Sequence, residues 1–333
     1  MRLTEKQVKD WADKKKIKKL ILVLRKIPSD NLAKLAIGAL VEAGEEAVRP
    51  LVKKLKDSDI VFRVSVENAL GRIGDPRAIE PLTRMLRDDS FQETGSIAEA
   101  LGNFKDECVV KELMDAYHRS GKYAVQGSII TALGNIGSAT AAPLIMEAMH
   151  HRESFVRKSA ALAMGSLPAE VALDQLAKAF ISEEDWEAKK EMARSMAKLR
   201  WKASPDRLGA EYCFINERWD EMVEIGEPAA EYILGYLNCD PSMCVPKMGV
   251  LIKMKEKSVP AIIAIIEKES EWSPRLKNCL MVLWNIKSER TVKPLINLLH
   301  HKDSSIRAMA VDCLKVIGTQ EALDAAKGLM GTF

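Results

Sequence analysis

The stretch FRVSVENALGRIGDP, residues 62–76, decides the fold of this chain. Its apolar residues recur every three to four positions, which predicts a helix with one buried face. The Gly-Asp-Pro at its end predicts a turn. A second helix is expected over residues 77–87, with Pro81 near its start, where a missing N–H costs little. The stretch therefore predicts one helical hairpin.

The same pattern returns along most of the chain. The apolar residue that precedes each turn recurs at intervals of 30 to 32 residues, with one longer gap. It stands at Leu40, Leu70, Leu101, Leu133, Met164, Met196, Leu283 and Leu314. A period in the low thirties that is filled by two helices is typical of an α-solenoid. We therefore expect an all-α fold, an α-α superhelix of stacked antiparallel helix pairs.

The repeat is interrupted once, between residues 199 and 226. Ser204-Pro205-Asp206 is a strong helix-start signal, and two short helices are expected over residues 208–215 and 219–225. The predicted organisation has four parts: basic N-terminal capping helices (1–29), a first stack (30–199), an irregular linker (200–227) and a second stack with a C-terminal cap (228–333).

Charge is unevenly distributed along the chain. The formal net charge is only +3, yet residues 1–26 carry ten Lys and Arg against three acids. The lysines within residues 14–19 either bind an anionic partner or solvate a capping element, and both interpretations stay open. No apolar run of about 18 residues suggests a membrane span, and residues 1–20 lack the apolar core of a signal peptide. A cytoplasmic location is therefore expected.

The cysteines and histidines do not form a recognisable metal pattern. The six cysteines, at positions 108, 213, 239, 244, 279 and 313, are interpreted as reduced and mostly buried thiols. Cys239 and Cys244 have no second Cys or His pair at zinc spacing nearby. The pairs His150-His151 and His300-His301 fall in links between helices and are interpreted as solvated loop residues. No metal and no cofactor is predicted.

Residues 156–165, VRKSAALAMG, resemble a HEAT repeat of the short prokaryotic type named after phycobilisome (bilin) lyase subunits. The resemblance covers about residues 30–328. It implies Asp–Arg pairs that bridge adjacent repeats, and these map onto Asp59 with Arg63 and Asp303 with Arg307. At Glu153 and Arg157 the acid is Glu. Thr94 and Gln126 replace the Arg of two units, so the series of bridging pairs is interrupted there.

The sequence lacks the common motifs of catalytic and phosphate-binding sites. The sequence has no phosphate-binding glycine loop of the Walker or Rossmann type, no Gly-x-Ser-x-Gly elbow and no His-Glu dipeptide. HEAT arrays are most often binding proteins, so the resemblance implies a non-catalytic scaffold or adaptor that binds a protein or peptide on its concave face. The alternatives are a bilin-lyase-like or other HEAT-fold enzyme, and a nucleic-acid-binding protein that uses its basic helices. The oligomeric state is left open.

One surface follows from the repeat. Positions six before, two before and two after the aligned apolar residue share one face of each inner helix, which solenoid curvature turns into a concave surface. The predicted binding residues from this set are Arg72, Glu99, Asn103, Asn135, Lys158, Lys190, Arg194, Lys198 and Asn285.

Overall fold

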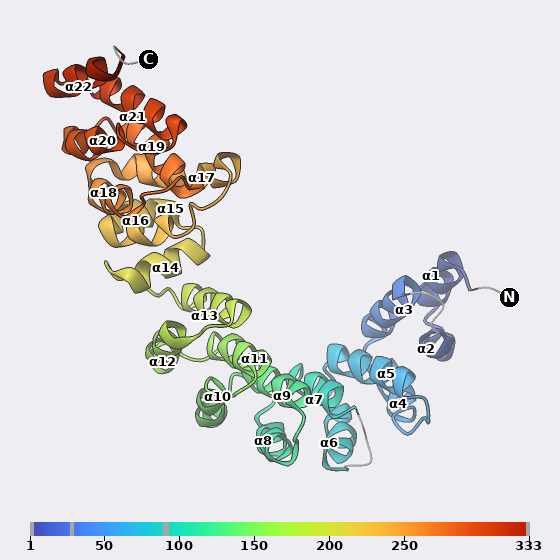
Figure 1. The fold of residues 1–333 in the computed structure, drawn as a ribbon. Helices are drawn as coiled ribbons and strands as arrows, with labels where there is room; N and C mark the ends of the chain where they lie inside the picture. The colour runs from blue at the N-terminus through green and yellow to red at the C-terminus, as the bar shows by residue number, and fades with distance from the viewer. Residues whose placement is uncertain (1–2, 27–29, 89–92, 331–333) are drawn as a thin grey trace. The chain divides into compact units, whose positions relative to one another are not determined.

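A computed structural model describes residues 3–26, 30–88 and 93–330 of the 333-residue chain. Over these residues the protein consists of α-helices and short 3-10 turns, without a strand (Figure 1). The all-α solenoid that the repeat predicts is thereby confirmed. The chain divides into two compact units, residues 1–201 and 202–333, and each is described by itself.

Unit 1 is built of helix pairs in two layers. The odd-numbered helices are α1 (Glu5–Asp13), α3 (Asp30–Ala43), α5 (Ile60–Ile73), α7 (Thr94–Gly102), α9 (Tyr123–Ile136), α11 (Ser154–Met164) and α13 (Trp186–Lys198). The even-numbered helices are α2 (Ile17–Lys26), α4 (Glu45–Val52), α6 (Ile79–Arg87), α8 (Val110–Arg119), α10 (Ala142–Ala148) and α12 (Ala169–Ser182). Each odd-numbered helix contacts the next one, which forms a continuous layer. We call this the inner layer, because it lies on the inner side of the curve of unit 1 (Figure 1).

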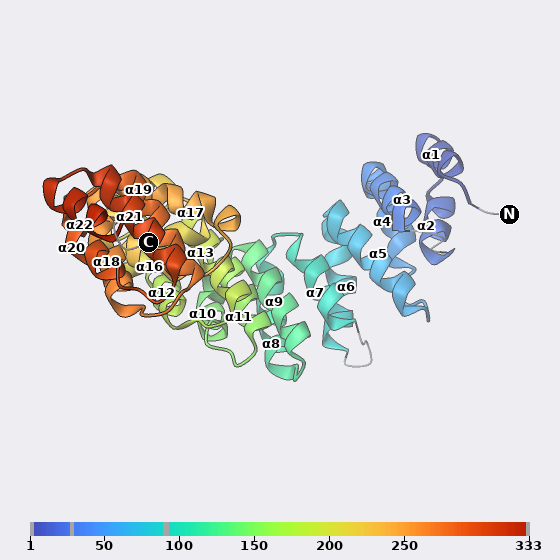
Figure 2. The ribbon, with the colours of Figure 1, turned by 45° about the horizontal axis from the view of Figure 1, so that its top comes forward.

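Unit 2 repeats the arrangement. One layer holds α15 (Trp219–Ile225), α17 (Pro241–Met254), α19 (Pro274–Ile286) and α21 (Ser304–Ile317). The other holds α14 (Arg207–Ile215), α16 (Glu227–Leu234), α18 (Val259–Lys268), α20 (Val292–Leu298) and α22 (Gln320–Met330). The two short helices expected after residue 204 are therefore present as α14 and α15. They pack on α16 and α17, so they form a further hairpin of this unit. Figure 2 gives a second view of both units.

The stretch that decides the fold forms α5 and the turn after it. Asp59 caps the helix by accepting a hydrogen bond from the backbone N–H of Phe62 (3.1 Å). Gly74 ends it in the left-handed conformation at φ +70°, which glycine adopts without a Cβ penalty. Asp75 then caps a 3-10 turn that starts at Pro76 and leads into α6. The predicted hairpin is confirmed, with this turn in place of the first residues of its second helix.

The arginines expected to pair with the acid four residues earlier bridge repeats in another way. Arg63 forms an ion pair with Glu93, thirty residues later, whereas Asp59 caps α5. Arg157 holds Glu183 with two hydrogen bonds of 2.7 and 2.8 Å, so its partner is not Glu153. The proposed Asp–Arg and Glu–Arg pairs were wrong. The helix N-terminus takes the side chain of Asp59, and the stacking brings a later acid within reach of Arg63 and Arg157.

Asp303 behaves in the same way, since it caps α21 by accepting from the N–H groups of Ser305 and Ile306. Arg307 turns instead to backbone oxygens and donates to the carbonyls of His301 (2.7 Å) and Lys302 (2.9 Å). Each cap thus orders the start of its helix, while the arginine ties the preceding link to that helix.

Neighbouring inner helices approach each other most closely at a glycine. A Cβ placed on Gly71 would lie 2.8 Å from the Cα of Ala100, which is closer than real Cβ atoms come. Gly71 therefore belongs to the helix contact, whereas Gly74 ends the helix. The equivalent contacts are Gly102 with Ala132, Gly134 with Ala163 and Gly165 with Ser195.

Replacement of Gly134 by Ala tests this close packing. The new Cβ would lie 2.5 Å from both Cα and Cβ of Ala163, so α9 and α11 must separate, and we expect a loss of about 1–3 kcal/mol in the free energy of unfolding. Gly38→Ala is the matched control, because nothing lies within 4 Å of its Cβ position and Ala favours a helix interior by up to about 1 kcal/mol. Urea unfolding of both variants measures the difference; equal stability of the two would contradict the role of the glycine.

Candidate functional site

The nine predicted binding residues all lie on odd-numbered helices or at their ends. In unit 1 these are Arg72 (α5), Glu99 (α7), Asn103 (the C-cap of α7), Asn135 (α9), Lys158 (α11), and Lys190, Arg194 and Lys198 (α13). Seven of the nine are exposed, and Lys158 and Lys190 are half-buried. Asn285 lies on α19 of unit 2. We call the eight residues of unit 1 the polar row.

Several residues of the polar row contact the adjacent inner helix. The hydroxyl of Ser128 donates to Oε1 of Glu99 (2.9 Å), and Nζ of Lys198 donates to Oγ of Ser166 (3.3 Å). Each contact joins one repeat to its neighbour, 29 and 32 residues along the chain. The polar row is therefore a set of side chains that the stacking itself positions.

The basic end of the polar row is interrupted by acids. Glu187 lies 3.4 Å from Nζ of Lys158, and Glu191 lies 3.6 Å from a guanidinium nitrogen of Arg194. This alternation weakens the positive potential that binding to a phosphate backbone depends on. It leaves a surface of mixed charge, which suits contacts with a protein.

Exposed aromatic side chains line the N-terminal ends of three neighbouring inner helices. Tyr123 begins α9, Phe155 is the second residue of α11 and Trp186 begins α13; their exposed fractions are 52%, 48% and 46%. The rings of Tyr123 and Phe155 meet edge to face at 6.4 Å. A Cβ on Gly127 would collide with the ring of Phe155, so that ring lies directly over α9. We call the three residues the aromatic edge.

The aromatic edge continues the face that carries the polar row. Phe155, Lys158 and Leu162 stand at i, i+3 and i+7, which places them on one side of α11. The sequence-based prediction of the binding face did not include the aromatic edge. The positions chosen for that face began six residues before the aligned apolar residue, and the three aromatic residues lie further back in their helices. The signal was present as an aromatic residue at the first or second position of each of these helices.

The odd-numbered layer of unit 2 carries a small apolar pocket of about 330 Å3. Its lining includes Met248, Met281, Trp284, Asn285 and Met309, from α17, α19 and α21. Asn285, a predicted binding residue, thus stands beside an exposed tryptophan. Methionines adapt their shape to irregular apolar partners, so this pocket also suits a protein side chain.

The lysines near the N-terminus are partly paired. Nζ of Lys14 lies 2.5 Å from a carboxylate oxygen of Asp10 and lowers the pKa of that exposed carboxyl. Lys15 pairs with Glu46 at 3.1 Å, and Lys19 stands over the ring of Trp11 at 5.2 Å. Much of this charge therefore serves the packing of the first helices.

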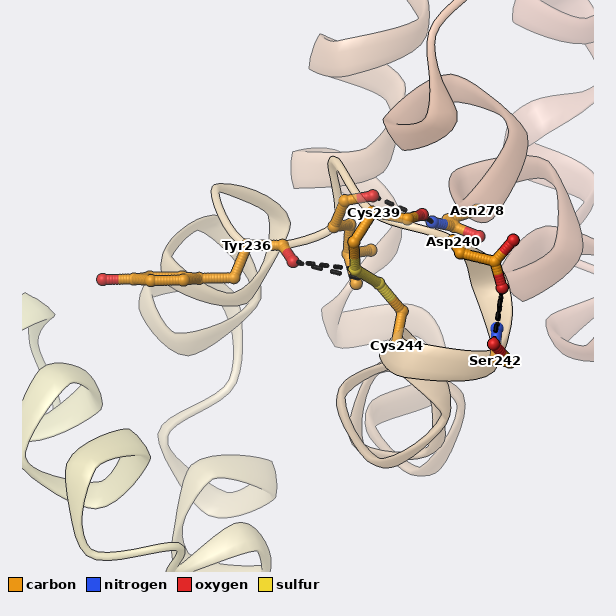
Figure 3. The surroundings of a disulfide bond; sticks show 7 residues. Tyr236, Cys239, Asp240, Ser242, Cys244 and Asn278 are labelled. Carbon is orange, nitrogen blue, oxygen red and sulfur yellow. Dashed lines mark hydrogen bonds between the residues drawn. A yellow bond between two sulfur atoms is a disulfide. The ribbon is translucent and has the colours of Figure 1, made fainter.

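Cys239 and Cys244 form a disulfide, which corrects the expectation of reduced thiols for this pair (Figure 3). The tight turn into α17 brings their Cα atoms to 6.6 Å, within the range that a disulfide spans. The amide of Asn278 on α19 holds the turn by donating to the carbonyls of Leu237 (2.8 Å) and Cys239 (3.0 Å). Disulfides are typical of oxidising compartments, so this bond does not favour the predicted cytoplasmic location.

The remaining cysteines and the histidine pairs show no arrangement typical of a metal site within the described residues. Cys213, Cys279 and Cys313 are buried, as expected, whereas Cys108 is exposed. Nδ1 of His151 and of His301 each accepts a backbone N–H two residues ahead, at 3.0 and 3.1 Å. His301 is buried, which corrects the expectation of a solvated residue at that position. Within the described part of the chain, no three His, Cys, Asp or Glu side chains are placed to share a metal ion. Among the same residues, no helix is long and apolar enough to cross a bilayer.

A buried carboxyl lies within the inner layer, between α5 and α7. Glu67 on α5 is fully buried, and burial raises its pKa to about 7, although the hydroxyl of Ser96 donates to its Oε2 (2.5 Å). The neighbouring carboxylate of Glu93 raises the pKa further, and the guanidinium of Arg63 lowers it. Near neutral pH this carboxyl is therefore half protonated inside the stack.

The Glu67→Gln variant tests this assignment. Because folding raises the pKa from 4.5 to about 7, the stability of the wild type falls as pH rises through this window. We expect Glu67→Gln to unfold like the wild type at pH 5 and to be more stable by about 1–3 kcal/mol at pH 8. Glu170→Gln, at an exposed position of α12, serves as the control and should shift neither value by more than about 0.5 kcal/mol. Urea titrations at both pH values measure the free energy of unfolding. A variant that is less stable than the wild type at pH 8 would contradict the raised pKa of Glu67.

Three solved structures illustrate what the chain is similar to. Escherichia coli YibA has a TM-score of 0.43 at 14% identity, covering 84% of this chain and 95% of that one. The complex of CpcE and CpcF of phycocyanin lyase from Nostoc sp. has a TM-score of 0.39 at 19% identity, covering 73% and 92%. Importin beta has a TM-score of 0.40 at 16% identity, covering 99% of this chain and 48% of that chain. These are likenesses of fold only.

No curated protein sequence matches this chain. The family profile described as HEAT repeats matches residues 17–102, 110–197 and 259–332. The first match begins at Ile17, the first residue of α2. The matched segments make up well over half of the sequence, and the helix pairs stack as such repeats require. The chain therefore belongs to the HEAT-repeat family.

Proposed function

We propose that this protein is a non-catalytic scaffold or adaptor that binds a protein or peptide along the inner layer of unit 1. The aromatic edge carries this proposal. Three large side chains that are about half exposed on consecutive helices form an apolar strip, and such strips on soluble proteins are typical of interaction sites. Tyr and Trp are also the residues that most often dominate the binding energy of protein interfaces.

The polar row would supply the rim of this interface. The side-chain amides of Asn103 and Asn135 are exposed and can each donate to and accept from a partner's backbone. The alternating charges around Lys158 and Arg194 would add specificity more than affinity. Nucleic-acid binding is less favoured, because Glu187 and Glu191 lie among these cations.

Comparative affinity capture with a Phe155→Ser, Trp186→Ser double variant tests the proposal. The tagged wild type and the variant would each be incubated with nuclease-treated native lysate, and retained proteins would be quantified by mass spectrometry. We expect the wild type to retain a specific protein at least about tenfold more strongly than the variant, because the anchors of the interface are lost. Both side chains are about half exposed, so the fold should survive, and thermal unfolding checks it.

Ile181→Ser provides the matched control. Ile181 is 64% exposed on α12, in the even-numbered layer, so its loss removes apolar surface outside the aromatic edge. This variant should retain the same protein as the wild type. The proposal fails if the aromatic variant retains that protein equally well, or if the wild type retains none.

A further inference from the structure

A second candidate binding site lies near the N-terminus, mainly on the even-numbered helices α2 and α4. α2, α4 and α5 surround a pocket of about 420 Å3. Its apolar wall consists of Ile21, Leu22, Pro50 and Phe62. Leu22 is 54% exposed although it stands in a helix with a well-buried opposite face, so apolar surface remains uncovered here. The size of the pocket is within the range of sites that hold small ligands or single side chains.

Every polar residue that lines this pocket is a cation. The five are Lys18, Arg25, Arg49, Lys53 and Lys54. Arg25 is partly neutralised by Asp57 at 3.2 Å and lies over the ring of Phe62. Within the described residues, the other four cations form no ion pair.

The acids nearest in sequence to these cations are engaged elsewhere. Glu45 pairs with Arg77 and Glu46 with Lys15, so neither neutralises Arg49 on the same helix. Lys53 and Lys54 follow the last residue of α4, where the negative end of the helix dipole favours cations without cancelling their charge. The pocket therefore combines an apolar wall with a positive rim.

We propose that this pocket binds an acidic peptide segment of a partner protein, with an apolar side chain of that segment inserted against Leu22 and Pro50. Four cations without an acidic partner around one opening exceed what a single carboxylate head group can neutralise, so charge complementarity favours several carboxylates in one ligand. The apolar wall would be unused by a polyphosphate or a nucleic-acid backbone. A segment with Asp and Glu around a Leu, Phe or Trp satisfies both features.

The inference does not rest on binding at the aromatic edge. The pocket involves α2 and α4, which lie in the even-numbered layer, and its chemistry is cationic where the aromatic edge is neutral. A partner could use either surface alone. The two proposals can therefore fail separately.

A pooled library of short labelled peptides, each with Asp and Glu around one Leu, Phe or Trp, tests this inference on the full-length chain. Two comparison libraries replace the apolar residue by Ser or the acids by Lys. We expect the protein to enrich the acidic, apolar peptides over both, and fluorescence anisotropy of a selected peptide to show affinity that falls with added salt. An Arg49→Glu, Lys53→Glu double variant should bind it at least about tenfold more weakly, because the rim becomes repulsive.

Leu22→Ser tests the apolar wall separately. Loss of this contact should weaken the selected peptide by about tenfold while the salt dependence stays unchanged. The control is Lys302→Glu with Lys327→Glu, which changes the net charge equally at exposed positions of unit 2 and should bind like the wild type. All of these substitutions are at exposed side chains, and thermal unfolding confirms that each variant is folded.

Three results would overturn the inference. The first is a lack of enrichment of acidic, apolar peptides over the Ser library. The second is equal binding of the selected peptide by the rim variant and the control variant. The third is binding of a fluorescent long-chain fatty acid that the rim and Leu22 variants abolish, with no peptide binding, which would assign the pocket to an anionic lipid.

Discussion

The close approach of consecutive inner helices is the constraint on which the rest of unit 1 depends. At Gly71, Gly102, Gly134 and Gly165 the next helix comes so near that no side chain fits between them. The distance between packed helices depends on the side chains at the contact, and glycine allows the two backbones to approach closely. This spacing brings side chains of adjacent repeats within hydrogen-bond reach, as for Glu99 and Ser128. The glycines at the helix contacts therefore also determine which surface side chains of adjacent repeats can meet.

Burial in such a stack makes its polar groups dependent on one another. Arg63 is nearly buried and needs the carboxylate of Glu93, because an unpaired cation in the interior is costly. Glu67 lies beside that pair without a cation of its own, and so its carboxyl holds a proton at higher pH than usual. The polar core of the first repeats is thus a coupled set, in which one positive charge is shared among acids from two hairpins.

Two surfaces of unit 1 offer different chemistry to a partner. The aromatic edge exists because the aromatic side chains at the starts of α9, α11 and α13 are exposed and because Gly127 leaves room for the ring of Phe155. The pocket beside α2 exists because the first hairpin covers α4 incompletely and leaves Leu22 and a set of cations uncovered. An extended array of hairpins allows such sites to differ along its length, since each hairpin packs only on its neighbours.

The amino-acid sequence by itself determined the helices, their pairing and the family, because a period of 30 to 32 residues and a turn signal such as Gly74-Asp75-Pro76 can be recognised along the chain. It also placed the polar row on the inner helices, since helical periodicity defines a face. Only the tertiary structure decided which acid pairs with Arg157, that Gly71 serves a helix contact, and that Cys239 meets Cys244. Those outcomes depend on distances between residues of different elements, which spacing along the chain does not specify. The sequence also did not specify that Tyr123, Phe155 and Trp186 are exposed, because burial depends on how the helices pack together.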